Sequence, residues 1–282
     1  MSREILVSPD RLQQLITAGD CLVVDCRFDL SDVNKGRNDW LAGHIPGAHY
    51  AHLDDDLAAP ITAHSGRHPL PETGAFAGFL ASLGWSEGQF VVACDEGSNA
   101  LAGRMWWLMR YFGQAAALLD GGLAAWKEAG LPLETGPVVS RQAPVAGLQA
   151  VTTMAVSSEQ VLNNLESKDD IVLDARSPER FSGQNETLDT KGGRIPDSVN
   201  RHMQLNLASN GKFKDPATLR SEFESLLGDT AAAAIVHSCG SGVTACHNLF
   251  AMELAGMDTG RLYPGSWSEW IRDPSRPVEM GN

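Results

Sequence analysis

Short apolar runs and amphipathic segments alternate along the chain, and the same order occurs in both halves. Residues 8–19 place apolar side chains at helical spacing, behind a serine suited to an N-cap and a proline suited to the first turn, and they end in glycine. An apolar run over residues 21–25 follows and ends in aspartate. Residues 157–174 repeat this order of amphipathic helix and buried strand. The pattern predicts an internal duplication.

The spacing of individual residues in the two halves supports a duplication. Asp25 and Asp174, at the ends of predicted strands, each begin a D-x-R motif and precede an Ile-Pro pair by nearly the same interval. Asp95 and Cys239 each follow a later predicted strand and precede a tryptophan by the same number of residues. Because several intervals agree, we expect two copies of one domain.

The alternation of β-branched runs with helical segments predicts an α/β fold with two tandem domains, each a parallel sheet flanked by helices. Residues 138–152 include a proline and show little periodicity, which is typical of a linker. We therefore predict domains over residues 1–137 and 153–282, which is the usual size range. The apolar segment 104–112 is predicted to be a buried helix, either between the domains or in a core.

The charge balance restricts the partners that the protein can have. The chain has 22 basic and 35 acidic residues and a net charge of −13, which disfavours nucleic-acid backbones and anionic membranes. We see neither a membrane-spanning apolar run nor a secretory signal. Five cysteines without a C-x-x-C pair are typical of a reducing compartment, so we expect a cytoplasmic protein. Without a histidine–cysteine cluster or a dinucleotide fingerprint, no metal or cofactor is predicted.

The candidate chemistry lies in one loop of the second half. Residues 234–237 predict a strand, and a helical pattern follows a loop that contains Cys239, Gly240 and Gly242. Backbone N–H groups in such a loop, together with the helix N-terminus, favour a thiolate, which is the nucleophilic form of cysteine. The small loop residues lead us to expect an open Cys239. The first half carries Asp95 at this place, so only the second half is predicted to be nucleophilic.

The other four cysteines are predicted to be buried packing residues. They are Cys21, Cys26, Cys94 and Cys246. Arg27 and Arg176, two residues after the strand-end aspartates, are predicted to tie the cysteine-loop region to the adjacent strand. Trp126 and Trp270 are predicted to serve packing rather than recognition.

The chain resembles the tandem rhodanese-domain sulfurtransferases over essentially its whole length. The resemblance is carried by the D-x-R strand ends, the HIPGA segment at residues 44–48 and the cysteine loop. The C-G-S-G-V-T loop at residues 239–244 is most similar to that of 3-mercaptopyruvate sulfurtransferases. The resemblance implies a two-step reaction in which Cys239 takes sulfur from a small anionic donor, 3-mercaptopyruvate, as a persulfide. The persulfide then passes its outer sulfur to a thiol, thioredoxin or cyanide.

The resemblance also assigns roles to single residues. It implies that Ser241 and Thr244 support the loop chemistry and that Ser241 joins a relay towards Asp54 and His68 of the first domain. The implied catalytic set is Cys239, Ser241, Thr244, Asp54 and His68. The implied donor-binding set is Arg180, Gly240, Gly242, Val243 and Arg194.

The sequence departs from the family pattern where the donor carboxylate is bound. Arg180 matches the first substrate arginine of the family, but the position of the second holds Asp189, which cannot bind a carboxylate. Lys191 and Arg194 are the candidates to compensate. The preferred donor, the physiological acceptor and the oligomeric state therefore stay open at this point.

Three other functions are compared with this interpretation. Thiosulfate sulfurtransferases place basic residues after the cysteine, whereas Gly240, Ser241 and Gly242 are neutral. Thiosulfate is therefore kept as the alternative donor and 3-mercaptopyruvate as the first. A non-catalytic persulfide carrier is a second alternative. A cysteine phosphatase needs an arginine six residues after the nucleophile, and Ala245 stands there.

Overall fold

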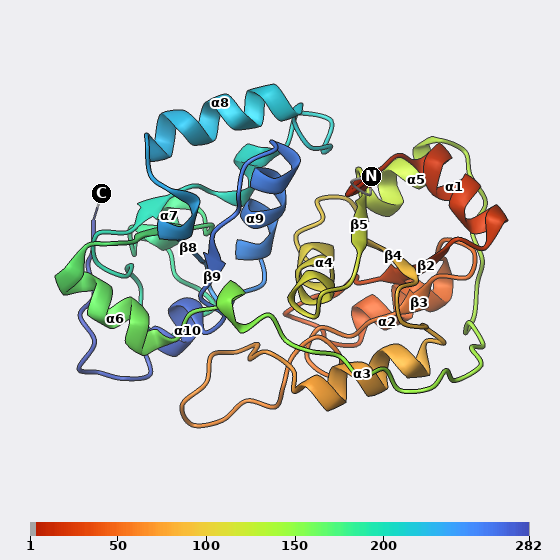
Figure 1. Ribbon diagram of the computed structural model, residues 1–282, viewed down its shortest axis with the longest axis horizontal. Coiled ribbons are helices and arrows are strands. Elements are labelled where there is room, and N and C mark those ends of the chain that lie inside the picture. The colour runs from red at the N-terminus through yellow and green to blue at the C-terminus, as the bar shows by residue number, and fades with distance from the viewer. Residues whose placement is uncertain (1–3, 282) are drawn as a thin grey trace. The chain divides into compact units, whose positions relative to one another are not determined.

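The computed structural model describes residues 4–281, which divide into two compact units (Figure 1). The first unit contains residues 4–59, 70–151 and 209–213. The second contains residues 60–69, 152–208 and 214–281. Residues 138–151, inside the predicted linker, form neither helix nor strand.

The first unit is built on a parallel five-stranded sheet in the order β1-β5-β4-β2-β3. The strands are β1 (Leu6–Val7), β2 (Cys21–Asp25), β3 (His49–Tyr50), β4 (Phe90–Cys94) and β5 (Ala116–Leu119). Its helices are α1 (Pro9–Ala18), α2 (Lys35–Ala42), α3 (Thr73–Ser82), α4 (Ala102–Tyr111) and α5 (Gly122–Glu128).

Helices cover both faces of this sheet. Val23 of β2 packs on one side with Leu12 of α1 and Trp126 of α5. Val24, the next residue of β2, points to the other face and is also buried, and α4 packs against β4 and β5. A parallel sheet with two buried faces needs near-continuous apolar strands, which is what the sequence contains. The predicted buried helix at 104–112 is confirmed by the buried side chains of α4.

The second unit repeats the plan with four parallel strands in the order β7-β6-β8-β9. The strands are β6 (Ile171–Asp174), β7 (Val199–Asn200), β8 (Ile235–Ser238) and β9 (Arg261–Leu262). The α-helices are α6 (Ser158–Ser167), α7 (Pro178–Phe181), α8 (Pro216–Leu227), α9 (Ala245–Leu254) and α10 (Ser266–Trp270). The 3-10 turns are η1 (Thr152–Met154), η2 (Met203–Asn206) and η3 (Ala232–Ala234).

Most predicted helix and strand ends are confirmed. Ser8 caps α1 by accepting the Arg11 N–H at 3.2 Å, and Gly19 ends the helix in the left-handed region at φ +73°. The strand before Cys239 differs slightly from the prediction. Ala234 lies in the 3-10 turn η3, so β8 begins one residue later and extends to Ser238.

The strand-end D-x-R motifs form the same buried structure in both units. The Arg27 guanidinium binds the Asp25 carboxylate at 2.7 Å and donates to the Gly43 carbonyl at 2.8 Å. Arg176 binds Asp174 at 2.8 Å and the Gly193 carbonyl at 2.9 Å. The predicted tie to the loop after the neighbouring strand is present in the first unit, where Arg27 also contacts Glu96, next to Asp95, at 3.5 Å. In both units the arginine has a further partner that was not predicted, a glycine carbonyl in the loop before the Ile-Pro pair.

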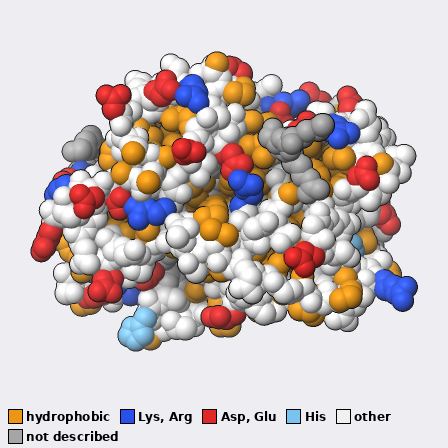
Figure 2. Space-filling view, viewed as in Figure 1, with side chains coloured by type: hydrophobic (Ala, Val, Ile, Leu, Met, Phe, Trp, Pro, Cys, Tyr) orange, Lys and Arg blue, Asp and Glu red, His pale blue; other side chains and the backbone are white. Residues whose placement is uncertain are grey.

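Charged side chains are scattered over the face shown in Figure 2, where basic groups lie among acidic ones. Among residues 4–281, the structure contains no helix of sufficient length and apolar character to cross a membrane.

Candidate active site

Cys239 lies directly after β8, in a tight loop that leads into α9. Ser238 at the end of β8 pairs with Asp174 of β6, so the loop begins at the carboxyl edge of the sheet. Gly242 has φ +73°, and a Cβ there would lie 2.3 Å from the Pro264 carbonyl oxygen. Only glycine fits this position. Its backbone N–H donates to the Cys239 Sγ at 3.2 Å, which is the contact that stabilises a thiolate.

The N-terminal turn of α10 holds the other side of the loop. The Cys239 N–H donates to the Ser266 Oγ at 3.1 Å, and the Cys239 carbonyl accepts the Trp267 N–H at 3.0 Å. The Gly240 carbonyl accepts the Ser268 N–H at 2.8 Å. These contacts fix the loop backbone on both sides of the cysteine, so the amide that faces the sulfur is preorganised.

The duplicate loop of the first unit shows what such a loop binds. Asp95 stands where Cys239 stands in the second unit, and its carboxylate accepts four backbone N–H groups. The donors are Gly97 at 3.0 Å, Asn99 at 2.8 Å, Leu101 at 3.0 Å and Ala102 at 3.4 Å. The loop is therefore a cradle for a negative charge. In the second unit the charge that it can hold is that of a thiolate or a persulfide.

Cys239 is buried, with 1% of its surface exposed, so the predicted open position is wrong. Burial does not separate it from Cys26 and Cys94, which are also fully enclosed. Their contacts differ, because the Cys239 Sγ accepts a backbone N–H, whereas the Cys26 Sγ faces the Val24 carbonyl at 3.8 Å. Burial raises the pKa of the Cys26 and Cys94 thiols well above the usual value. The Sγ of Cys246 instead donates to the Gly242 carbonyl at 3.4 Å.

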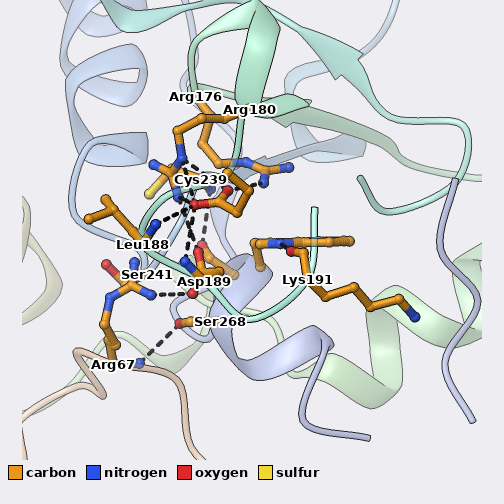
Figure 3. A network of polar contacts seen from close by, with 12 residues as sticks. Arg67, Arg176, Arg180, Leu188, Asp189, Lys191, Cys239, Ser241 and Ser268 are labelled. Atoms are coloured by element: carbon orange, nitrogen blue, oxygen red, sulfur yellow. Dashed lines mark hydrogen bonds and ion pairs between the residues drawn. The ribbon is translucent and has the colours of Figure 1, made fainter. Parts of the chain in front are cut away.

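A cluster of charged side chains adjoins the cysteine loop (Figure 3). Arg180 on α7 binds the Glu186 carboxylate at 2.9 Å and one oxygen of Asp189 at 3.1 Å. Burial raises the pKa of the Glu186 carboxyl, but hydrogen bonds from Arg180 and from the amides of Leu188 and Asp189 outweigh it, so that pKa is lowered. Glu186 therefore stays ionised beside Arg180.

A second arginine joins this cluster from the segment 60–69. The other Asp189 oxygen accepts a hydrogen bond from the Arg67 Nη1. A Cβ placed on Gly240 would lie 3.1 Å from the Arg67 Nη2 and 3.4 Å from the Arg180 Nη2. Both guanidiniums thus face the residue after the cysteine. Sequence reasoning singled out His68 but missed Arg67, although the two are adjacent.

Ser241 and His68, both predicted site residues, are in contact. The Ser241 Oγ and the His68 Nδ1 are 2.7 Å apart, and both side chains are buried. Thr244 occupies the N-cap position of α9, and Val243 is buried beside it. Asp54 belongs to the first unit, where burial raises the pKa of its carboxyl. Its part in the relay stays a prediction.

The two residues expected to compensate for Asp189 have other contacts. Arg194 binds the Glu279 carboxylate at 2.5 Å and the Gly281 carbonyl, and its guanidinium lies over the Phe181 ring. The Lys191 carbonyl accepts the Trp267 Nε1–H at 2.8 Å, and in Figure 3 the Lys191 side chain points away from Arg180. Compensation by either residue stays a prediction.

Comparison with known proteins identifies the family. The family description "Rhodanese-like domain" matches residues 8–129 and 157–273, which is most of both units. The chain belongs to the tandem rhodanese-domain sulfurtransferases. A Pseudomonas aeruginosa protein named "Probable 3-mercaptopyruvate sulfurtransferase" is 42% identical over 285 residues and covers 100% of both chains. This sulfurtransferase is also 33% identical to "Thiosulfate sulfurtransferase" of Bos taurus, over 94% of this chain and 91% of that one.

Solved structures agree with the assignment of the fold. The crystal structure of the 3-mercaptopyruvate sulfotransferase SseA from Escherichia coli aligns with a TM-score of 0.82 and 29% identity. The alignment covers 94% of this sulfurtransferase and 100% of the other chain. The relatives are named for both donor classes, so they do not decide between 3-mercaptopyruvate and thiosulfate.

Proposed function

We propose that this sulfurtransferase takes sulfur from 3-mercaptopyruvate, holds it as a persulfide on Cys239 and passes it to a thiol acceptor. The observation that carries the proposal is the position of the sulfur. The Gly242 N–H points at the Cys239 Sγ in a loop whose duplicate binds a carboxylate. Guanidinium groups next to Gly240 supply an anchor for the carboxylate of the donor.

The first step is an attack of the Cys239 thiolate on the donor sulfur. An S–S bond forms and the C–S bond of mercaptopyruvate breaks, with its electron pair moving to carbon as the enolate of pyruvate. The enolate takes up a proton and leaves as pyruvate. Peptide N–H groups that face the developing charge act in a buried site, where such dipoles have their largest effect.

The second step returns the enzyme to its starting form. A thiolate of the acceptor attacks the outer sulfur of the persulfide, a new S–S bond forms on the acceptor, and the Cys239 thiolate leaves. We propose a small thiol or thioredoxin as this acceptor, in keeping with the family. Cyanide, the other proposed acceptor, attacks the outer sulfur through its carbon, forms a C–S bond and leaves as thiocyanate. Ser241, held by His68 at 2.7 Å, is the proposed hydroxyl that assists the departing enolate.

Thiosulfate is the second candidate donor, and one observation favours it. The residues after Cys239 are neutral, but Arg67 and Arg180 bring two guanidiniums to Gly240 from elsewhere in the second unit. Two such groups suit a sulfonate as well as a carboxylate. Steady-state rates with the two donors, measured side by side with cyanide and with a thiol, rank them.

Mass spectrometry of the Cys239 peptide after exposure to each donor tests the shared step. We expect an increase of about 32 daltons for the added sulfur, which a thiol acceptor removes. Cys239→Ser should lack both the increase and turnover, whereas Cys246→Ser should keep most of the activity. Turnover by Cys239→Ser would reject the mechanism. A wild-type protein that consumes neither donor but accepts sulfur from a desulfurase would instead be a persulfide carrier.

A further inference from the structure

The carboxylate of Asp189 is bound in the way that a small anion is bound between two arginines. One of its oxygens accepts from Arg67 and the other from Arg180 at 3.1 Å (Figure 3). Only 4% of the Asp189 side chain is exposed, so water does not screen these contacts. A buried carboxylate bridging two guanidiniums is the arrangement expected of a substrate carboxylate.

Arg67 is positioned for this role by contacts on both sides. Its backbone N–H donates to the Ser268 Oγ at 3.0 Å, and the next residue, His68, is held by Ser241. A Cβ on Gly66 would lie 2.5 Å from the Gly265 carbonyl oxygen, so the backbone packs directly against the start of α10. The buried Arg67 Nε has no hydrogen-bond partner among the described residues. The guanidinium therefore keeps a donor available beside the cysteine loop.

The loop that carries Asp189 also orients it. The Glu186 carboxylate accepts the N–H groups of Leu188 at 2.9 Å and Asp189 at 3.1 Å, and it binds Arg180 from the other side. Glu186 thus holds the turn, whereas the Asp189 side chain reaches between the two arginines. Cys239 is buried, so a donor reaches the sulfur only if side chains move. The Asp189 carboxylate is the group that a donor anion can replace with equivalent contacts.

We propose that Arg67 is the second guanidinium of the donor-anion site and that Asp189 is its internal counter-ion, which the donor anion displaces. The proposal rests on the proposed function for the identity of the donor. It explains how a chain with an acid at the family's second arginine position can bind an anion. Arg176, which also contacts Glu186, is neutralised by Asp174. With Asp189 displaced, the charges of Arg67 and Arg180 therefore exceed that of Glu186 by one, which suits a monoanionic donor.

Kinetics of three variants test the proposal through the donor KM. Asp189→Asn should lower the KM for 3-mercaptopyruvate about tenfold, because one competing charge-assisted contact is lost. Arg67→Met should raise it by about tenfold or more on the same grounds. In the double variant Arg67→Met/Asp189→Asn, the decrease in KM that Asp189→Asn causes should disappear. Asp197→Asn, at an exposed site in the same unit, is the control for the change in net charge.

A second readout does not depend on sulfur transfer. Iodoacetate and iodoacetamide differ by one negative charge, and both alkylate a thiolate. We follow alkylation of Cys239 by peptide mass spectrometry and divide the rate with iodoacetate by the rate with iodoacetamide. This ratio reports binding of an anion beside the sulfur. The ratio should rise in Asp189→Asn and fall in Arg67→Met.

The two readouts separate the two ideas. Shifted alkylation ratios in an enzyme that turns over neither donor would support the anion site and reject the proposed function. Turnover with an unchanged KM and an unchanged ratio in both folded variants would overturn the inference. A raised KM in Asp189→Asn would also overturn it, because Asp189 would then assist donor binding.

Discussion

The backbones of Asp95 and Cys239 make equivalent hydrogen bonds in the two units. The Asp95 carbonyl accepts the Leu123 N–H at 2.9 Å, and the Cys239 carbonyl accepts the Trp267 N–H at 3.0 Å. Both residues directly follow a strand that pairs with a D-x-R strand. One loop design therefore holds a fixed carboxylate in the first unit and a reactive sulfur in the second.

The fixed carboxylate should contribute strongly to stability. Asp95→Ala leaves several buried N–H groups without an acceptor, so we expect the free energy of unfolding to fall by about 3 kcal/mol. Asp95→Asn keeps one acceptor oxygen, so its free energy of unfolding should lie between those of the wild type and Asp95→Ala. Urea unfolding measures both, and Asp20→Ala, at an exposed site in the same unit, is the control. Equal midpoints for Asp95→Ala and the control would show that water replaces the carboxylate.

The tight packing around Gly242 predicts that a larger residue there lowers activity. Gly242→Ala would press a Cβ against the Pro264 carbonyl oxygen at 2.3 Å, which moves the N–H that faces the Cys239 sulfur. We expect sulfur transfer to fall by about 100-fold, the usual effect of losing an aligned anion-stabilising donor.

Gly19→Ala is the matched control for backbone strain. Gly19 has the same φ of +73°, but no atom lies within 4 Å of the Cβ position. Gly19→Ala should lower the free energy of unfolding by about 1 kcal/mol and leave sulfur transfer unchanged. Circular dichroism checks that both variants fold. Full activity in a folded Gly242→Ala would show that the amide contact does not matter.

The local parts of this structure could be predicted from the sequence. The N-cap at Ser8, the stop at Gly19 and the strand ends at Asp25 and Asp174 depend on residues a few positions away. The cysteine loop was found from its glycines, which lie between a predicted strand and a helical pattern, and Asp95 in the duplicate indicated which half is nucleophilic. Such patterns depend on short-range stereochemistry and on periodicity, which a single sequence displays.

The donor-anion cluster could not be predicted in this way. Arg67 and Asp189 are far apart in the sequence and meet because segment 60–69 packs within the second unit. Cys239 is also buried, although the small residues of its loop led us to expect an open position, because α10, which is distant in the sequence, packs against the loop. The one available signal was the adjacency of Arg67 to His68.

Two arginines of the second unit should respond differently to substitution. Arg180→Met leaves Glu186 and Asp189 without their shared partner, so we expect the KM for 3-mercaptopyruvate to rise by about tenfold or more. The effect should be smaller for mercaptoacetone, in which a methyl group replaces the carboxylate. Equal effects on both donors would remove the anchoring role of Arg180.

Arg194→Met tests the compensation that the sequence suggested. Its contacts with Glu279 and Gly281 lead us to expect a loss of about 1–2 kcal/mol in stability with little change in donor KM. Urea unfolding and steady-state kinetics separate the two effects. A KM that rises as much as in Arg180→Met would place Arg194 in the donor site.

A buried histidine next to the cysteine loop should make stability depend on pH. His237 in β8 is fully buried, and its Nε2 donates to the Thr259 carbonyl at 2.8 Å, while its Nδ1 has no partner among the described residues. Burial lowers the pKa of His237 to about 4 from an ordinary value of 6.5. The folded chain therefore binds the His237 proton only at a lower pH than the unfolded chain does.

Because the pKa of His237 is lower in the folded chain, acid destabilises the protein. Above pH 6.5 the imidazole is neutral in both states, so its contribution to stability is complete; it is lost as the pH falls from 6.5 through about 4. The full loss is about 3 kcal/mol. His237→Gln keeps an amide donor for the Thr259 carbonyl but does not titrate, so its urea midpoint should fall less than that of the wild type across this range. His64→Gln, at an exposed histidine, should follow the wild type. If all three proteins lost stability in parallel, the acid sensitivity would belong to the carboxylates and not to His237.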